Sequence, residues 1–206
     1  MIKDIYYYEY IWLDGANNLR SKTKILIPKD QSESYMYPLD YNNIPIWNYD
    51  GSSTGQADGS DSEVLIKPQT QYNDPFRENS FLILCDTYNP DMTPHKTNTR
   101  VKAVEIFSKN QELKPMFGIE QEFFLQKGKD ILGFSNGETE KQGNYYCGNG
   151  SNNAIGRKVV EQAMKNCVYA GLNLTGLNAE VAPSQWELQV CSEGIKAADD
   201  LIMMRY

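Results

Sequence analysis

Four glutamates lie at spacings that could bring their carboxylates together. Glu120 and Glu122 are one residue apart inside Phe117–Leu125, a run in which apolar side chains alternate with polar ones. This alternation is typical of a β-strand, where residues two apart share a face and lie roughly 6.5 to 7 Å from each other. Glu180 and Glu187 lie in a second apolar and aromatic run further along the chain. We expect two strands whose four carboxylates converge on one site.

Carboxylates inside apolar runs need a compensating partner. An ionised carboxylate buried without one would take up a proton or destabilise the fold. Carboxylate oxygens are the ligands that Mg²⁺ and Mn²⁺ prefer, and these cations commonly neutralise phosphate oxygens during phosphoryl transfer. The four glutamates are therefore candidate ligands of a divalent cation. The alternative is a solvated strand face, which is where most Glu-x-Glu pairs on strands occur.

Other chemistries have less support in the residues. His95 is the only histidine, and we interpret it as a solvent-exposed loop residue beside Pro94, so a serine or cysteine nucleophile would have to take its base from there. The chain has no G-x-x-x-x-G-K-[ST] or G-x-G-x-x-G sequence that would cradle phosphates. Its four cysteines are far apart without a C-x-x-C pair, which indicates reduced, buried thiols.

The charge pattern limits the class of partner. The formal net charge is -7, and the lysines and arginines are scattered, which argues against a nucleic-acid partner and favours a cation. The N-terminal residues lack an apolar signal core, and no apolar run approaches the length of a membrane span. We therefore expect no membrane partner and a cytoplasmic location.

The elements that position these residues can be predicted from periodicity. Runs rich in β-forming residues at 5–13 and 23–27 predict a hairpin, since the turn-forming residues 14–18 separate them. The apolar run 81–85 predicts a central strand. A polar Gly/Ser/Asp segment, 50–61, is too long to be a simple connector and is typical of a functional loop.

Two prolines and a loss of periodicity after the third strand predict a boundary between two domains, at residues 1–92 and 93–206. The second domain would begin with a helix, at about residues 99–109, capped by Thr97 or Asn98.

Helical spacing recurs later in the second domain. Val160, Met164 and Val168 would form one apolar face, and Gly171 would end that helix. Residues 195–206 also have helical spacing but no cap, so we expect the chain to stop inside a helix.

Six stretches of the chain, in order, resemble the sequences of eukaryotic-type glutamine synthetases. They are Tyr10–Gly15, Trp47–Gln56, Asp74–Arg77, Phe117–Glu122, Tyr145–Gly148 and Asn178–Val190. The resemblance runs through almost the whole chain. It implies an α+β fold, with an N-terminal β-grasp domain followed by a catalytic domain on a curved antiparallel sheet with helices. It also implies a homo-oligomeric ring with active sites shared between neighbouring subunits.

The resemblance implies an ATP-dependent reaction in which glutamate is phosphorylated on its side-chain carboxylate and ammonia then displaces the phosphate. L-glutamate and ammonium would be the substrates, ATP and Mg²⁺ or Mn²⁺ the cofactors, and L-glutamine, ADP and phosphate the products. The charge that develops on the transferring phosphoryl oxygens explains why such a site is lined by metal-binding carboxylates.

The resemblance also implies roles for particular residues. Glu122, Glu180 and Glu187 would hold one divalent cation, and Glu120 would be a ligand of a second cation nearer the ATP phosphates. Asp50 would reach into the neighbouring subunit's site, where it would help to bind ammonium and remove its proton. The nucleotide-binding residues would be Glu187, Leu188, Gln189, Val190, Cys191 and Ser192.

The chain departs from the family by stopping at Tyr206, before the family's His-x-Asn segment and its phosphate- and glutamate-binding arginines. We therefore expect a truncated catalytic domain and a chain that is inactive alone. Two other interpretations stay open. One is a non-catalytic assembly or binding module that docks on full-length subunits, and the other is a carboxylate-amine ligase or guanidino-kinase relative that uses another amine.

Overall fold

The computed structural model describes residues 5–28, 36–134, 142 and 144–206. The chain folds into two compact units: the first runs up to Leu113, and the second runs from Lys114 to Arg205. The boundary predicted between residues 92 and 93 therefore lies before helix α2 (Arg100–Ser108), which the structure groups with the first unit.

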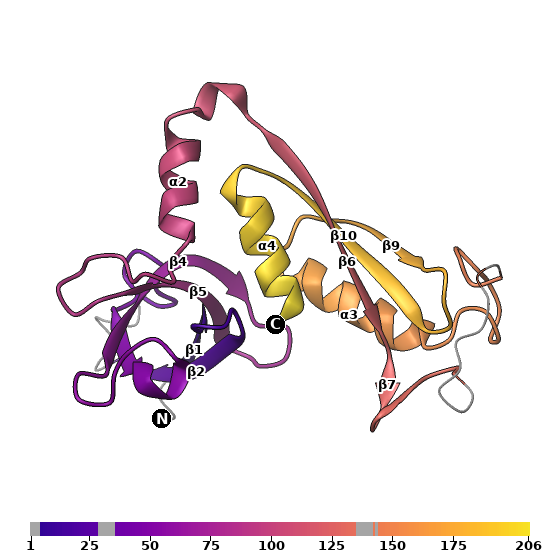
Figure 1. Cartoon of the computed structure of the whole chain (residues 1–206), viewed down its shortest axis with the longest axis horizontal. Coiled ribbons are helices and arrows are strands. Elements are labelled where there is room, and N and C mark those ends of the chain that lie inside the picture. Colours follow the sequence, from indigo (N-terminus) through magenta and orange to yellow (C-terminus); the bar gives the residue numbers. More distant parts are fainter. Residues whose placement is uncertain (1–4, 29–35, 135–141, 143) are drawn as a thin grey trace. The chain divides into compact units, whose positions relative to one another are not determined.

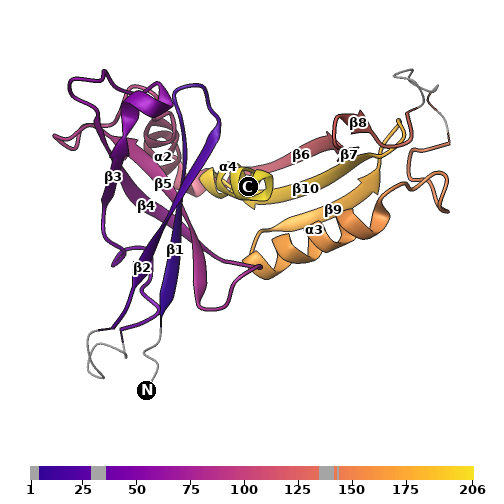
Figure 2. The ribbon, with the colours of Figure 1, turned by 90° about the horizontal axis from the view of Figure 1, so that it is seen from below.

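The first unit is built around a five-stranded sheet with the order β2-β1-β5-β4-β3 (Figures 1 and 2). Its strands are β1 (Tyr6–Leu13), β2 (Leu19–Leu26), β3 (Trp47–Asp50), β4 (Glu63–Asn73) and β5 (Ser80–Tyr88). Neighbouring strands are antiparallel except β1 and β5, which pair in parallel at the centre of the sheet. A short 3-10 helix, η1 (Gly51–Thr54), follows β3, and another, η2 (Gln111–Leu113), follows α2.

Alternating aromatic residues of β1 form the core of this unit. Tyr8, Tyr10 and Trp12 are buried on one face of the sheet, where they form one cluster with Ile66 of β4 and Ile83 of β5. The predicted hairpin and central strand are confirmed. The predicted helix is also confirmed as α2, within one residue at each end.

Two strands of this sheet were not predicted. β3 is only four residues long, and β4 contains Pro68. Because proline cannot donate a hydrogen bond to a sheet, it argues against a strand in a sequence. The structure accommodates it through a shift in the pairing register between Pro68 and Thr70.

The second unit contains a three-stranded antiparallel sheet with the order β6-β10-β9. Its strands are β6 (Met116–Phe124), β10 (Gln185–Glu193) and β9 (Leu174–Ala179), and a small hairpin is formed by β7 (Gln126–Lys127) and β8 (Asp130–Ile131). The helices are α3 (Arg157–Ala170) and α4 (Ile195–Arg205). α3 contacts β9, whereas α4 packs on β10 and β6 (Figure 2).

The helices α3 and α4 lie on one face of this sheet. A cavity of about 600 Å³ on that face is lined by Phe123 and Leu188 from the sheet, Ala163 from α3, and Met204 and Arg205 from α4. Because side chains alternate along a strand, Glu122 and Glu187 point to the opposite face. The sheet thus separates a helix-covered side from a side that carries the carboxylates of Glu122 and Glu187.

Helix α3 ends as predicted but is less buried than predicted. Gly171 has a φ of 97° and donates its N–H to the carbonyls of Cys167 and Val168, so it is the C-cap. Val160 is 1 % exposed, but Val168 is 59 % exposed. The prediction that Val160, Met164 and Val168 form one buried apolar face was therefore wrong for Val168, because the sheet covers a narrower stripe of the helix.

No helix within the described ranges is long and apolar enough to span a membrane. All four cysteines are free thiols, as predicted, but only Cys85 is buried as expected, and Cys147 is exposed.

Candidate metal site and the Asp50 turn

The pairing register of the second sheet brings three predicted ligands together. Glu122 on β6 lies directly opposite Glu187 on β10, and Glu187 lies opposite Asn178 on β9. Glu180 follows the last residue of β9. One carboxylate oxygen from each of Glu122, Glu180 and Glu187 lies within 4.8 Å of the other two, and we call this group the three-carboxylate cluster.

Side-chain amides hold these carboxylates in place. Asn178 donates from Nδ2 to Glu180 Oε1 over 2.9 Å, and Gln185 donates from Nε2 to Glu122 Oε2 over 2.7 Å. Gln189 donates from Nε2 to Glu187 Oε1. Asn178 and Gln185 were not named as site residues from the sequence, and Gln189 was predicted only as a nucleotide-binding residue. Gln185 and Gln189 share the strand parity of Glu187, a signal that could have identified this role.

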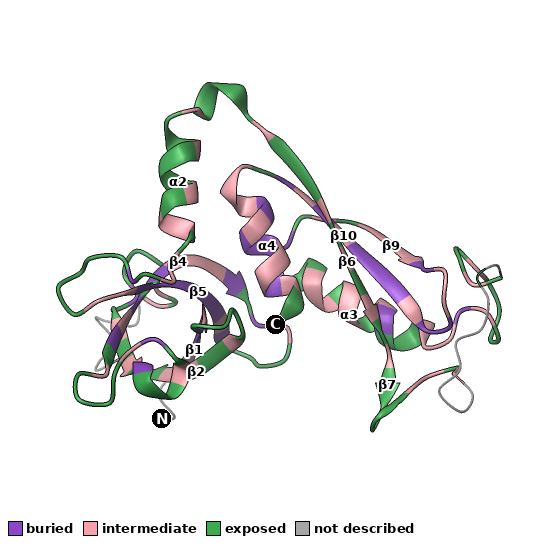
Figure 3. Ribbon diagram, in the orientation of Figure 1, coloured by how far each residue is buried: buried purple, intermediate pink, exposed green. Residues whose placement is uncertain are grey.

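The cluster is buried at one side and open at the other. Glu180 and Glu187 are buried, whereas Glu122 is exposed, and β10 is the most buried of the three strands (Figure 3). Burial raises the pKa of the Glu180 carboxyl above its ordinary value, and repulsion by Glu122 and Glu187 adds to this rise. Within the described part of the chain, no lysine or arginine forms an ion pair with these three carboxylates.

The donor set fits a hard divalent cation. It consists of three carboxylates, whose oxygens are the ligands that Mg²⁺ and Mn²⁺ prefer. A cation would also relieve the repulsion that raises the pKa of Glu180.

Glu120 lies outside the three-carboxylate cluster. It is exposed on β6 and faces Gln189 across the sheet, with Gln189 Nε2 lying 3.5 Å from Glu120 Oε1. The expected convergence of four carboxylates is therefore met by three, because Glu120 is two residue pairs further along the ladder. Its role as a ligand of a second cation stays a prediction.

The six predicted nucleotide-binding residues all lie on β10, but they do not share a face. Glu187, Gln189 and Cys191 have the parity of the carboxylate face, whereas Leu188, Val190 and Ser192 point to the helix side. Val190 is 0 % exposed, and Ser192 donates from Oγ to Asp200 Oδ2 over 2.7 Å. Only the first three side chains are thus on the side of the cluster, and nucleotide binding by this segment stays a prediction.

Asp50 is the N-cap of η1 in the first unit. Its Oδ1 accepts hydrogen bonds from Ser52 N, at 2.9 Å, and from Ser52 Oγ, at 2.6 Å. These two bonds lower the pKa of the Asp50 carboxyl, which is solvent-exposed. The turn therefore presents an ionised carboxylate at the surface, as its predicted role in binding ammonium requires.

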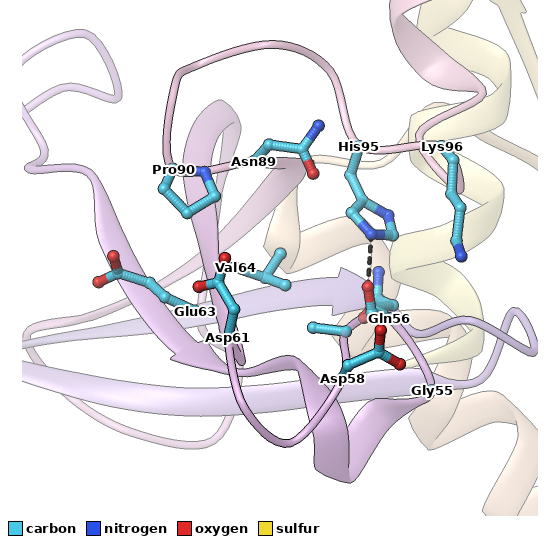
Figure 4. A pocket seen from close by; sticks show the side chains of 11 residues that line it. Gly55, Gln56, Asp58, Asp61, Glu63, Val64, Asn89, Pro90, His95 and Lys96 are labelled. Carbon is cyan, nitrogen blue, oxygen red and sulfur yellow. Dashed lines mark hydrogen bonds between the residues drawn. The ribbon is translucent and has the colours of Figure 1, made fainter.

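His95 is buried, so its interpretation as an exposed loop residue was wrong. Its side chain contacts Gln56 and Thr97, and His95 and Gln56 both line a cavity of about 480 Å³ (Figure 4). Proline and polar neighbours are typical of an exposed loop, but the burial depends on a tertiary hydrogen bond to Gln56, which is remote in sequence.

The comparisons with known proteins agree with this geometry. Residues 97–206 match the family model "Glutamine synthetase, catalytic domain". Over 96% of its length, the chain is 47% identical to glutamine synthetase N-1 of Phaseolus vulgaris and 48% identical to the glutamine synthetase of Panulirus argus, covering 56% and 54% of them. It is 44% identical to a putative glutamine synthetase of Acanthamoeba polyphaga mimivirus, covering 56% of that protein. The chain thus spans about half the length of the curated relatives it matches.

A solved structure described as a GmaS/ADP complex has the same fold as this chain. The TM-score is 0.69 at 17% identity, and the match covers 98% of this chain and 45% of the other. By sequence, the chain belongs to the glutamine synthetase family. The family match begins at residue 97, which lies between the predicted domain boundary, after residue 92, and the boundary of the two compact units, after Leu113. The predicted domain boundary therefore stays a prediction.

Replacing Glu180 by glutamine should remove one source of pH dependence in the metal-free chain. Folding raises the pKa of Glu180 above its ordinary value of 4.5, so the folded state holds this proton more tightly than the unfolded state does. The carboxyl therefore destabilises the fold increasingly as the pH rises from about 4.5 through the raised pKa. Urea denaturation at several pH values should show Glu180→Gln gaining stability relative to the wild type over this window. A difference that is constant with pH would contradict the cause assigned here.

Proposed function

We propose that this chain forms part of the active site of an ATP-dependent glutamate-ammonia ligase, which makes L-glutamine, ADP and phosphate. The observation that carries the proposal is the three-carboxylate cluster, Glu122, Glu180 and Glu187, in a chain of the glutamine synthetase family. We propose Mg²⁺ or Mn²⁺ as its ligand, ATP as the phosphoryl donor, and L-glutamate and ammonium as the substrates.

Each group of residues has a separate part in this proposal. A bound divalent cation would neutralise charge on phosphoryl oxygens. The side-chain amides of Asn178, Gln185 and Gln189 hold the carboxylates oriented before any cation arrives, which lowers the reorganisation needed for binding. Glu120 is proposed as a ligand of a second cation, and the residues of β10 from Glu187 to Ser192 as neighbours of the nucleotide.

We also propose that the first unit is a β-grasp domain that acts in a ring of subunits. The sheet order β2-β1-β5-β4-β3, with a parallel pair at its centre and antiparallel partners outside, supports this assignment. In such a ring, the Asp50 carboxylate would serve a neighbouring subunit's site. We propose a cytoplasmic location for the protein.

A chimera tests the proposed function. Residues 1–206 of this chain would replace the matching residues of a curated relative, so that the remaining residues come from an established sequence. We expect glutamine formation that depends on ATP, ammonium and Mg²⁺, and its loss when Glu187 is changed to glutamine. A chimera that folds and assembles but makes no glutamine would contradict the proposal. Changing Glu105, an exposed carboxylate on α2, to glutamine serves as the matched control.

Replacing Asp50 by asparagine should impair the use of ammonium. Asparagine retains an oxygen for the Ser52 contacts but removes the charge that would attract NH₄⁺ and accept its proton. In the chimera, we expect kcat/KM for ammonium to fall about 100-fold, within the range for loss of a general base, with little change in KM for glutamate.

Asp91 offers a control for this substitution. Its Oδ1 accepts from Thr93 N over 2.9 Å and from Thr93 Oγ1 over 2.6 Å, which are the contacts that Asp50 makes with Ser52. Asp91→Asn should leave the kinetics unchanged. An equal loss in both variants would trace the effect to the turn conformation and contradict a role for the Asp50 charge.

A further inference from the structure

The only histidine of the chain closes a ring of hydrogen bonds. His95 Nε2 lies 2.7 Å from the carbonyl oxygen of Gln56, and Gln56 Nε2 donates to Thr97 Oγ1 over 2.9 Å. Thr97 Oγ1 lies 2.8 Å from His95 Nδ1. Figure 4 shows the bond from His95 to Gln56.

These contacts define the protonation of the imidazole ring. A carbonyl oxygen only accepts hydrogen bonds, so Nε2 of His95 carries a hydrogen. Thr97 donates its backbone N–H to Nδ1 over 3.2 Å, so Nδ1 carries none. His95 is therefore neutral and in the Nε2–H tautomer. A second proton on Nδ1 would oppose the Thr97 N–H.

Gln56 connects this ring to the turn that carries Asp50. It is 3 % exposed, and its N–H donates to the carbonyl of Gly51, the residue after Asp50, over 2.8 Å. Its side-chain Oε1 accepts from Tyr49 Oη over 2.6 Å, on the other side of Asp50. The residues on both sides of Asp50 are thus bonded to Gln56.

The turn has little room to adjust if Gln56 moves. A Cβ on Gly51 would lie 2.5 Å from a methyl group of Val64, so the backbone there is tightly enclosed. Gly51 N also donates to Ser62 O over 2.6 Å. Displacement of Gln56 would therefore pass to Asp50, whose exposed side chain is held by hydrogen bonds from the neighbouring Ser52 and Ser53.

Charged groups line the same cavity as His95. Asp58, Asp61 and Glu63 come from the segment after the turn, and Lys96 is the neighbour of His95 in sequence (Figure 4). The hydrogen bonds of the His95 ring run to Gln56 and Thr97, so it is these two residues that the imidazole positions.

We propose that His95 is a positioning residue for Asp50: in its neutral Nε2–H form, it ties residues 95–97 to Gln56 and so fixes the turn that presents the Asp50 carboxylate. The catalytic consequence of this inference rests on the proposed function, whereas the coupling of His95 to the turn does not.

NMR spectroscopy tests the tautomer without overlap, because the chain has one histidine and therefore one pair of imidazole nitrogen signals. With ¹⁵N-labelled histidine at pH 7, we expect an unprotonated Nδ1 resonance and a protonated Nε2 resonance. The Nδ1–H tautomer or a doubly protonated ring would overturn the proposal.

Two variants test the coupling to Asp50. His95→Phe removes both ring nitrogens, and Thr97→Val removes the hydroxyl that closes the ring. In each, we expect exchange of the Ser52 amide, which donates to Asp50, to accelerate about tenfold, the factor expected for one lost hydrogen bond. The pKa of Asp50, followed by its carboxyl ¹³C shift, should rise towards its ordinary value. If His95→Phe does not fold, the Thr97→Val variant alone tests whether the ring of hydrogen bonds is coupled to Asp50.

Rescue separates positioning from simple packing. His95→Gln retains a donor and an acceptor, so Ser52 exchange and the Asp50 titration should stay within about twofold of the wild type. Unchanged Ser52 exchange and Asp50 titration in folded His95→Phe or Thr97→Val would overturn the proposal.

Kinetics separate this proposal from the proposed function. In the chimera, His95→Phe should raise KM for ammonium and leave KM for glutamate unchanged. If Asp50→Asn has no effect on ammonium use, the proposed function of Asp50 fails while the spectroscopic results stand. If Asp50→Asn is impaired but the His95 variants leave Ser52 and Asp50 unaltered, the positioning role fails alone.

Discussion

Replacing Glu187 by glutamine is expected to weaken the binding of Mn²⁺ to this chain by about 100-fold. Glu187 is the central member of the three-carboxylate cluster, since it lies on the middle strand opposite Glu122 and is 5 % exposed. Glutamine has the same shape but loses the charge and one oxygen ligand. Isothermal titration calorimetry of the purified chain with Mn²⁺ measures the change directly.

The control for this prediction is Glu105→Gln on α2. Glu105 belongs to the first unit, is exposed and pairs with Lys109 over 2.6 Å. Its replacement removes the same charge from the chain, so it tests whether the loss in Glu187→Gln is local. Equal affinities for Mn²⁺ in the two variants would show that the cluster is not the binding site.

Replacing Trp186 by alanine is expected to destabilise the second unit by about 3 to 5 kcal/mol. Trp186 is 0 % exposed and packs against Val160 of α3 and Ala179 of β9, while its Nε1 donates to the carbonyl of Ile155 over 2.8 Å. Its removal leaves a cavity between the sheet and α3. It also loosens the strand that carries Glu187, so Mn²⁺ binding should weaken as well.

Amide hydrogen exchange measures this effect with an internal control. Protection of the β10 amides should fall, whereas that of the β1 and β5 amides in the first unit should not change. Trp186→Phe keeps an aromatic ring but loses the hydrogen bond to Ile155, and we expect a smaller loss of about 1 to 3 kcal/mol. Similar losses in the two variants would contradict the assignment of the larger effect to the cavity.

The sequence predicted the metal cluster better than it predicted its surroundings. Strand parity and the family resemblance were sufficient to group Glu122, Glu180 and Glu187. The strand face alone could not separate Glu120 from the cluster, because Glu120 and Glu122 lie on the same face. The separation depends on which residues pair across the strands. Glu120 lies opposite Gln189 and not opposite a carboxylate.

The burial of single polar residues was the least predictable feature. His95 was expected to be exposed, yet it is 5 % exposed because Gln56 and Thr97 provide partners that only the tertiary fold brings together. Asp200 was not singled out in the sequence, but it is 0 % exposed and bonds to Ser192 and Lys196. A polar side chain can be buried only where its hydrogen-bonding groups find partners, and the order of residues in the sequence does not show which partners the fold provides.

Strand prediction failed for a different reason. The strands β1 and β5 can be recognised from their apolar and aromatic residues, whereas β4 has only three consecutive apolar residues, Val64 to Ile66, before Pro68 and mostly polar residues after it. Its place in the sheet follows from pairing with β5 and from the register shift that accommodates the proline. Local propensity therefore gives way to tertiary pairing in this strand.

The most direct test of the central claim is the location of Mn²⁺ in crystals of this chain, from its anomalous scattering. If the three carboxylates form a divalent-cation site, one peak should lie about 2.0 to 2.3 Å from an oxygen of each of Glu122, Glu180 and Glu187. Crystals grown in saturating Mn²⁺ that show no peak there, or peaks only at other carboxylates, would contradict the account.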